Sequence, residues 1–240
     1  MAQYAPDVPV FNLSRTMAAG PPIHPRLTHL ACDLTQATAI EEVAVRLRTL
    51  MPREGRMLLV NNSGFGSYGA FPDPGVGRNL EMIDLNVRAI VHLTGLLWPE
   101  LQARGGVIVN VASLAGYQPT PLMSTYAATK AFVLNWSVAL DAEARPHGLR
   151  CLAVCPGPVS TNFSRAAGFA TSTGLGGQTA EACADEILDA MEGEAIERVT
   201  GLRNRLLSVI SARLPKAWAA AVGLRMIRRL RLDRLLRRDT

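Results

Sequence analysis

Two apolar segments on either side of a helix place the strongest constraint on the fold of this chain. Residues 107–112 and 150–155 each have the length and apolar content of a buried strand, and residues 124–130 open the helix between them. Shorter apolar segments alternate with helical patterns along the rest of the chain. This alternation predicts an α/β fold, in which helices cover both faces of a parallel sheet.

The same patterns give the extent of the other elements. We expect further strands at residues 8–13, 27–32, 57–60 and 198–201, and helices at residues 36–50, 79–103, 121–145, 179–191 and beyond 201. Thr35 and Thr179 are each suited to cap the helix that follows, because a threonine hydroxyl accepts a hydrogen bond from a free N–H of the first turn. Residues 164–178 are rich in Gly, Ser and Thr and are predicted to form a mobile loop.

Three polar residues are candidates for acid–base chemistry at one crevice. Tyr126 and Lys130 are four residues apart, so they share one face of the predicted helix. Ser113 directly follows the strand at 107–112, and ligands of α/β proteins bind at the carboxyl ends of strands. A free tyrosine has a pKa of about 10, which a cation one helical turn away would lower. Ser113 could donate a hydrogen bond to a substrate carbonyl oxygen.

Asn86 lies in the middle of the helix predicted at 79–103, where asparagine is a poor helix former. Its side chain, or the carbonyl that it frees, could hold a water molecule that connects Lys130 to bulk solvent. Each candidate also has an ordinary interpretation: a packing tyrosine, a solvated lysine, a serine that ends a strand, and an asparagine that joins two helices. Their order, element type and spacing agree, which favours the functional interpretation.

The positive charge of the chain is confined to its C-terminal part. Residues 201–240 contain 11 Lys/Arg and two Asp, a net charge of +9, whereas residues 1–200 contain 14 Lys/Arg and 18 Asp/Glu, a net charge of −4. We expect a weak contact of residues 216–240 with anionic membrane surfaces and no nucleic-acid binding. A solvated helix that packs on the body of the protein, or on a partner subunit, is the ordinary interpretation of this segment and the favoured one.

The cysteines indicate a reducing compartment. Their spacing fits no zinc site, so no metal is expected, and we predict that they are reduced core residues: Cys32, Cys151, Cys155 and Cys183. The start of the chain lacks the features of a signal peptide, and no apolar run approaches the roughly 18 residues needed to span a bilayer. These features predict a cytoplasmic protein, either free or peripheral to a membrane.

Over residues 8–201 the motifs together resemble those of the short-chain dehydrogenase/reductase (SDR) family. Ser113, Tyr126 and Lys130 match its Ser…Tyr-x-x-x-Lys signature, and Asn86 matches its fourth catalytic position. Residues 61–64, Asn-Asn-Ser-Gly, resemble its Asn-Asn-Ala-Gly segment. Other matches are the acidic residue that contacts the adenine and the segment that lines the nicotinamide: Asp33, Pro156, Val159 and Thr161.

The resemblance implies a Rossmann-like sheet and hydride transfer between NAD(P)(H) and a carbonyl or secondary alcohol. Tyr126 would be the acid/base, Lys130 would tune it and hold the nicotinamide ribose, and Ser113 would position the carbonyl. Arg15 matches a position where a basic residue suits the 2′-phosphate, so NADP(H) is the expected cofactor and NAD(H) the alternative. The implied cofactor-binding residues are Arg15, Asp33, Leu34, Asn61, Ser63, Tyr126, Lys130, Pro156, Val159 and Thr161.

The first strand, glycine-rich turn and first helix of the family have no counterpart before residue 8. We therefore expect a domain at 1–200 that lacks the first βα unit, followed by a basic helical extension at 201–240. Residues 64–69 fit G-x-G-x-x-G, but the prolines and glycines of residues 70–78 oppose an immediate helix, so this segment is interpreted as a loop. An upstream start, a fragment and a degenerate member with a binding role are open interpretations.

The residues around the expected site carry few charges, which predicts an apolar substrate such as a steroid-like, retinoid-like or acyl ketone. They are the loop at 114–123 and the lid residues Phe163 and Phe169. The resemblance also implies a homodimer or homotetramer formed through the helices at 79–103 and 121–145. The alternative function is a catalytically impaired protein that binds a membrane surface or a partner through its Arg-rich tail.

Overall fold

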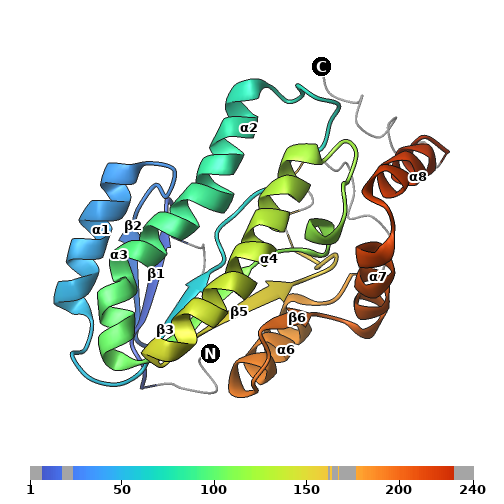
Figure 1. The fold of residues 1–240 in the computed structure, drawn as a ribbon. Coiled ribbons are helices and arrows are strands. Elements are labelled where there is room, and N and C mark those ends of the chain that lie inside the picture. Colours follow the sequence, from blue (N-terminus) through green and yellow to red (C-terminus); the bar gives the residue numbers. More distant parts are fainter. Residues whose placement is uncertain (1–6, 18–23, 162, 164–166, 168–176, 230–240) are drawn as a thin grey trace.

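The computed structural model of the 240-residue chain describes residues 7–17, 24–161, 163, 167 and 177–229. Parallel strands alternate with helices, as predicted (Figure 1). The strands are β1 (Val10–Ser14), β2 (Leu27–Ala31), β3 (Met57–Asn61), β4 (Gly106–Val111), β5 (Leu149–Cys155) and β6 (Glu197–Val199). The helices are α1 (Ala37–Leu50), α2 (Val76–Ile83), α3 (Ala89–Arg104), α4 (Ser124–Ala144), α6 (Ala180–Glu192), α7 (Leu202–Arg213) and α8 (Lys216–Arg229). Most of the loop expected at 164–178, Phe169 within it, and residues 230–240 lie outside the described residues.

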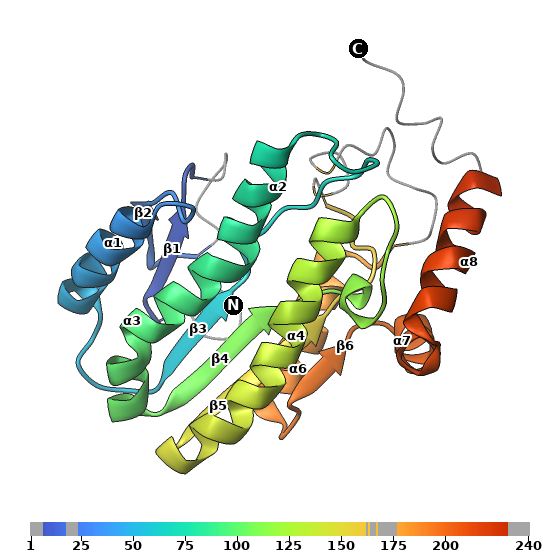
Figure 2. The same cartoon turned by 45° about the horizontal axis from the view of Figure 1, so that its top comes forward.

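The parallel sheet is built in two parts. β3, β4, β5 and β6 form a four-stranded sheet in that order, and β1 pairs with β2. Within the described residues, no ladder of hydrogen bonds connects these two parts. Figure 2 shows the β1–β2 pair beside β3, on the side away from β4. In the described part of the chain, β1 and β3 therefore each have one edge without a strand neighbour.

Helices lie on both faces of the sheet, which confirms the predicted layers. Helices α1, α3 and α4 cover one face (Figure 1), where Ile108 of β4 packs in the same apolar cluster as residues of all three. The next residue, Val109, points to the opposite face and packs against α6. Both side chains are fully buried. A central strand that is covered on both faces has to be apolar at successive positions, and this explains the continuous apolar run that predicted it.

Of the two predicted helix caps, one is confirmed and one is wrong. Thr179 Oγ1 accepts a hydrogen bond from Ala182 N at 3.1 Å and caps α6. The N-cap of α1, however, is Gln36 rather than Thr35. Thr35 N and Thr35 Oγ1 both donate to Asp33 Oδ1, at 2.9 and 2.8 Å, so this hydroxyl is used by the loop before the helix.

The helix predicted at 79–103 begins at Val76 and contains a π-helical turn. The Asn79 side chain donates to the carbonyl oxygens of Pro72 (3.3 Å) and Gly75 (2.9 Å), which fixes the chain at the helix start. The π turn spans Asp84–Arg88 and separates α2 from α3. Single π turns within α-helices occur frequently at functional sites.

The C-terminal helices lie at one edge of the molecule, beyond β6 (Figures 1 and 2). The helical structure predicted after residue 201 is confirmed for α7 and α8. In the part of the chain that the structure describes, no helix combines the length and the apolar content that crossing a bilayer requires.

Candidate active site

Ser113 lies just beyond the carboxyl end of β4. Its backbone is extended, and its Oγ accepts a hydrogen bond from Ala115 N at 3.1 Å, which starts the 3-10 turn η2 (Leu114–Tyr117). The loop is tied to the neighbouring strand because Leu114 N donates to Pro156 O at 2.9 Å. The Ser113 hydroxyl hydrogen remains available for donation. A fixed donor therefore lies where the sequence placed it, at the end of the central strand.

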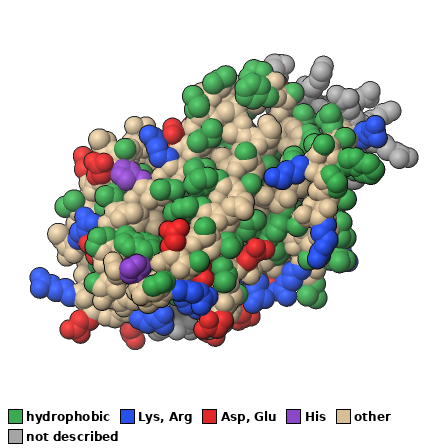
Figure 3. Space-filling view, in the orientation of Figure 1, with side chains coloured by type: hydrophobic (Ala, Val, Ile, Leu, Met, Phe, Trp, Pro, Cys, Tyr) green, Lys and Arg blue, Asp and Glu red, His purple; other side chains and the backbone are tan. Residues whose placement is uncertain are grey.

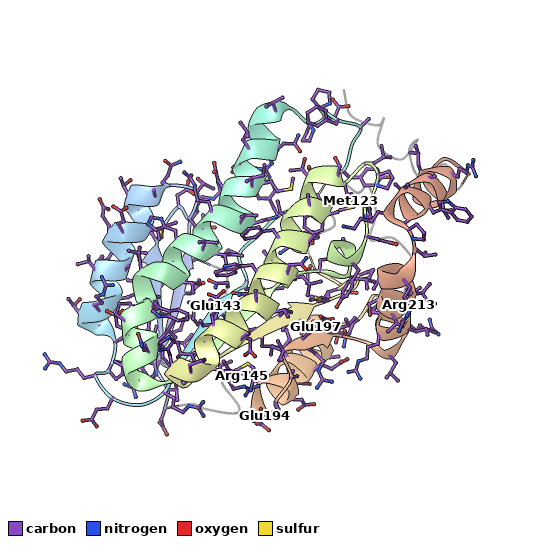
Figure 4. The ribbon with its side chains drawn as sticks, in the orientation of Figure 1. Met123, Glu143, Arg145, Glu194, Glu197 and Arg213 are labelled. Carbon is purple, nitrogen blue, oxygen red and sulfur yellow. The ribbon has the colours of Figure 1, made fainter. Side chains whose placement is uncertain are left out.

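Tyr126 occupies the first turn of α4 and is only 7 % exposed. The ring packs in an apolar cluster, with its centroid 5.6 Å from that of Phe163. The Ser113 side chain lies close enough to the Tyr126 hydroxyl to influence its pKa. The other members of the cluster come from four separate segments: Phe65, Met82, Leu85, Ala115 and Met123. Met123 marks the end of α4 that carries this cluster, whereas Arg145 marks the far end (Figure 4).

Lys130 lies one turn after Tyr126 and is 4 % exposed. Its Nζ donates a hydrogen bond to Val111 O at 2.7 Å, at the end of β4, and lies 5.9 Å from the centroid of the Tyr126 ring. The ordinary interpretation of Lys130 as a solvated surface charge is therefore wrong. The structure brings Ser113, Tyr126 and Lys130 together around the end of one strand.

The ionisation of the two residues on α4 differs from the expectation. Burial raises the pKa of Tyr126, and the Ser113 side chain opposes this rise in part. Burial also lowers the pKa of Lys130 to about 8. Surroundings that exclude water disfavour the charged form of both groups, whichever sign that charge has. The sequence argument considered only the attraction between the two charges and so predicted the wrong direction for Tyr126.

Asn86 is fully buried in the π turn, and its side-chain amide is engaged with protein groups. Its Oδ1 accepts from Phe65 N at 3.1 Å, and its Nδ2 donates to Phe65 O at 2.9 Å and to Thr129 Oγ1 at 3.1 Å. The side chain thus fastens the loop after β3 to α4, and the water molecule expected at the Asn86 side chain or carbonyl stays a prediction.

Two glycines let this loop pass close to the candidate catalytic residues. A Cβ atom at Gly64 would lie 2.9 Å from Asn86 Oδ1 and 3.5 Å from Lys130 Nζ. A Cβ atom at Gly66 would lie 3.0 Å from the Phe163 ring and 3.2 Å from the Tyr126 ring. A side chain at Gly64 would displace the Asn86 amide, whereas a side chain at Gly66 would require the Phe163 and Tyr126 rings to move by a few tenths of an ångström.

Arg15 and Asp33 follow the ends of β1 and β2. The Arg15 guanidinium is exposed and lies 3.5 Å from Glu81. Hydrogen bonds from the Thr35 backbone and side chain hold the pKa of Asp33 below its usual value, and Arg15 contributes to this lowering. Leu34, by contrast, packs against the large apolar cluster. Arg15 and Asp33 thus lie at a second position along the same edge of the sheet.

Asn61 has a structural role that the sequence did not reveal. Its Nδ2 donates to Asn110 Oδ1 at 2.7 Å and to Thr94 Oγ1 at 3.1 Å, and Asn110 Nδ2 donates to Ser137 Oγ at 2.9 Å. This buried chain joins β3, β4, α3 and α4 directly below the site. The role of Asn110 was not predicted, although a polar residue in the middle of an apolar strand indicates a buried hydrogen-bond network.

The remaining predicted residues lie at the ends of β3 and β5. Ser63 is half-buried in the loop after β3. Val159 makes an isolated bridge to Gln178, and Thr161 is exposed, with its Oγ1 accepting from Phe163 N at 3.2 Å. These positions, with Pro156, border the same end of the sheet as Ser113.

The donor set suits the two ends of a nicotinamide dinucleotide. Lys130 keeps N–H donors beyond the one given to Val111, and these could bind ribose hydroxyls. Both bonds from Thr35 use Asp33 Oδ1, so Oδ2 is left to accept from an adenine amino group. Residues 64–69 are not followed directly by a helix, since α2 begins only at Val76, and they are correctly interpreted as a loop.

Comparison with known proteins identifies the family. The short chain dehydrogenase family profile matches residues 14–172. A very-long-chain 3-oxoacyl-CoA reductase of Danio rerio is 40% identical over 114 residues, which are 45% of this chain and 36% of that protein. A ketoacyl reductase of Nostoc is 38% identical over 104 residues, 43% of this chain and 36% of that protein. The chain thus spans about a third of the length of these curated relatives.

Solved structures agree with this assignment. A short-chain dehydrogenase from Sphingobium yanoikuyae, in complex with NADPH, is 30% identical with a TM-score of 0.68, and the match covers 78% of this chain and 73% of that one. A short-chain dehydrogenase from Burkholderia cenocepacia, in complex with NADP, shares the fold at 24% identity with a TM-score of 0.71. The match covers 95% of this chain and 86% of that one. The fold, the Ser–Tyr–Lys geometry and the profile match lead to one conclusion: this chain belongs to the short chain dehydrogenase family of oxidoreductases.

Proposed function

We propose that this chain is an NAD(P)(H)-dependent oxidoreductase that interconverts a carbonyl and a secondary alcohol on a mostly apolar small molecule. The observation that carries the proposal is the placement of Ser113 beside the buried Tyr126 at the end of β4, with the Lys130 ammonium buried one turn further along α4, 5.9 Å from the centroid of the Tyr126 ring. An acid/base, a donor to the carbonyl oxygen and a nearby cation are the groups that such a reaction needs.

In the direction of reduction, Tyr126 acts as the general acid. Its phenol proton moves to the substrate carbonyl oxygen while the Ser113 hydroxyl donates a hydrogen bond to that same oxygen. The nicotinamide, when bound, supplies the hydride. Because burial raises the pKa of Tyr126, the phenol is protonated at neutral pH, which is the form that an acid requires. In the direction of oxidation the Tyr126 phenolate takes the proton back.

Lys130 stabilises the phenolate that Tyr126 becomes after it has given up its proton. The two side chains share a poorly solvated region, where a charge–charge attraction is stronger than in water. The N–H groups that Lys130 does not give to Val111 would bind the nicotinamide ribose. Asn86 acts as a positioning residue, because it holds the Phe65 backbone against α4.

NADP(H) is the proposed cofactor, with Arg15 as the group that recognises the 2′-phosphate. Arg15 is exposed at the end of β1, and Asp33 at the end of the neighbouring β2 would contact the adenine. The Sphingobium yanoikuyae structure described above contains NADPH, which supports the same choice.

An apolar ketone is the proposed substrate, because the surroundings of Tyr126 are almost entirely hydrocarbon. Of the steroid-like, retinoid-like and acyl ketones, the names of the Danio rerio and Nostoc relatives favour acyl ketones. A 3-oxoacyl thioester is therefore the first substrate to test.

The Tyr126→Phe substitution tests the proposal directly. It removes only the phenolic oxygen, so NADPH-linked reduction of the ketone should fall by at least about 100-fold. The affinity for NADPH, measured by fluorescence quenching, should stay within about twofold, because the ring and its packing remain. Tyr117→Phe is the matched control, since the Tyr117 hydroxyl bonds to Glu197 instead and its loss should leave turnover unchanged. Turnover at the wild-type rate in Tyr126→Phe would show that the acid is a different group.

A further inference from the structure

Helix α7 carries its apolar side chains on the outside. The only buried residue within it is a serine, Ser208, and Asn204 lies on the inner side, where it donates to Thr200 O at 2.8 Å and touches Gly157. Leu202 and Leu206, in contrast, are 79% and 65% exposed, and three more large apolar residues of the helix are exposed with them: Leu207, Val209 and Ile210. A surface helix of a globular protein normally has the opposite arrangement.

The exposed apolar surface continues into α8. Trp218 is 71% exposed and Val222 is exposed one turn later, whereas the small residues Ala219 and Gly223 face inward. Leu214, in the link between the two helices, is exposed as well. Large apolar residues thus recur at every fourth position: Leu202, Leu206, Ile210, Leu214, Trp218 and Val222. We call the exposed residues of α7, α8 and their link the C-terminal face.

Basic residues are interspersed on the C-terminal face, and acidic residues are missing from it. Residues 202–229 contain six Arg and one Lys and no Asp or Glu. Arg205 pairs with Glu186 at 2.8 Å, but the other cations with described side chains form no ion pair within the described residues: Arg203, Arg213, Lys216 and Arg225. Figure 3 shows green and blue side chains together at this edge of the molecule, and Figure 4 shows Arg213 on the outer side of α7.

We propose that the C-terminal face docks on an anionic lipid surface. Its apolar side chains would enter the interfacial layer of the bilayer, while the Arg and Lys head groups reach the phosphates on flexible stems. A second copy bound through the same face would oppose cations to cations without any carboxylate to pair them. A nucleic acid would meet the cations but leave eight exposed large apolar side chains in a polar interface. An anionic membrane satisfies both the charges and the apolar residues.

The C-terminal face adjoins the candidate active site. A Cβ atom at Gly223 would lie 3.5 Å from Pro121, so α8 packs directly on the loop that leads into Tyr126 and the start of α4. Docking would therefore place this loop next to the lipid. If the proposed function holds, an apolar ketone dissolved in the membrane could reach the site without crossing water, although the docking itself does not depend on that function.

Vesicle co-sedimentation tests the docking without any measurement of activity. The purified protein should bind vesicles of phosphatidylcholine mixed with phosphatidylserine at least about tenfold more tightly than vesicles of phosphatidylcholine alone. Replacing three exposed cations, Arg203→Gln, Arg213→Gln and Lys216→Gln, should weaken binding to the mixed vesicles by roughly 100-fold, because each contributes about fivefold. Replacing three exposed apolar residues, Leu206→Ser, Ile210→Ser and Trp218→Ser, should weaken binding by at least about tenfold.

A matched control is available on α1, away from the C-terminal face. The double substitution Val45→Ser with Arg46→Gln also removes one exposed apolar residue and one exposed cation, and it should leave vesicle binding unchanged. Equal binding to both kinds of vesicle, or unchanged binding of the apolar variant, would overturn the proposal. So would a stable dimer of the wild-type protein, measured by analytical ultracentrifugation, that the Leu206→Ser, Ile210→Ser and Trp218→Ser variant converts to a monomer.

Discussion

Lys130 shows how strongly its surroundings control a single charge in this molecule. The lowering of its pKa from 10.5 to about 8 corresponds to roughly 3 kcal/mol of lost solvation. Its one described hydrogen-bond acceptor is the uncharged Val111 carbonyl, so this loss is only partly offset. The ammonium is still charged at neutral pH, because 7 lies below 8. The folded protein thus places a cation next to Tyr126, and this cation, Lys130, loses its proton only slightly above neutral pH.

Carbonyl reduction should therefore slow as the pH rises above about 8. Below that pH Lys130 is protonated and stabilises the phenolate of Tyr126; above it the charge is lost, while Tyr126 itself, with its raised pKa, is still a phenol. The dependence of kcat/KM on pH for NADPH-linked reduction measures this. In Lys130→Arg, whose guanidinium stays charged, any remaining activity should decline only at higher pH. A wild-type profile that is flat through pH 8 would contradict the assignment.

Arg15 and Glu81 offer a paired test of cofactor choice. Arg15→Ala should weaken NADPH binding by about tenfold or more and change NADH binding by less than about twofold, because only NADPH carries the 2′-phosphate. Glu81 lies 3.5 Å from Arg15 and competes with that phosphate, so Glu81→Gln should strengthen NADPH binding. Both affinities follow from fluorescence quenching. An equal loss for the two cofactors in Arg15→Ala would mean that this guanidinium does not read the 2′ position.

At the residue scale, the sequence located the candidate site but not its electrostatics. Ser113, Tyr126 and Lys130 could be found because strand ends and helical spacing are local properties of the chain. The direction of the Tyr126 pKa could not, since it depends on burial by Phe65 and Met82, which are remote in sequence. For the same reason the hydrogen bond between Asn61 and Asn110 was not predicted, and the cofactor role of Asn61 stays a prediction.

The buried chain from Asn61 through Asn110 to Ser137 acts at the level of elements. It crosses from β3 to β4 and then to α4, where Ser137 Oγ donates to Val133 O at 2.6 Å. Ordinary ladder hydrogen bonds hold two strands together but leave the helix free to slide. A chain of side-chain bonds that ends on α4 fixes the helix relative to the strands, and Tyr126 is carried on that helix.

Asn110→Ala should lower the free energy of unfolding by about 2–4 kcal/mol, because the Asn61 amide and the Ser137 hydroxyl each lose a partner while they stay buried. Urea denaturation measures the loss. Asn135→Ala on the exposed side of α4 removes the same group and should change the free energy by less than about 0.5 kcal/mol. Similar values for the two variants would show that the buried network is not a source of stability.

Element boundaries were predicted to within a few residues wherever the apolar period was strong. The errors fall where a side chain had a choice of partners: Thr35 bonds to Asp33 instead of capping α1, and Asn79 anchors a helix start at Val76. The π turn around Asn86 left only an indirect trace in the sequence, a polar residue in an otherwise helical segment. Such choices are decided by neighbours in space, which periodicity does not report.

On the scale of the whole molecule, the two parts of the sheet should differ in their local stability. Within the described residues β1 and β2 have only each other for hydrogen bonding, whereas β4 lies between β3 and β5. Amide hydrogen exchange should therefore be faster in β1 than in β4, by about tenfold or more. Peptide-resolved mass spectrometry measures this. Equal protection of the two strands would mean that the whole sheet opens as one unit.

The sequence did not predict that α7 exposes its apolar side chains and buries its polar ones. Leucines and arginines alternate so closely in this helix that the sequence does not divide into an apolar face and a polar face. Only the position of α7 against Gly157 and Thr200 shows that the side chains facing inward are the polar ones. The sequence did establish the excess of positive charge in this region, but it could not show that apolar residues share the same surface.

The π turn at Asp84–Arg88 determines which side of α3 faces the core relative to the side of α2 that faces Arg15. One extra residue in a turn rotates everything after it by about 100° relative to an uninterrupted α-helix. Before the turn, Glu81 is directed toward Arg15; after it, Leu93, Leu97 and Leu101 are directed into the core. The two orientations are therefore adjusted independently. Deleting a single residue from this turn would rotate α2 relative to α3, so that either Glu81 would turn away from Arg15 or the leucines of α3 would turn away from the core.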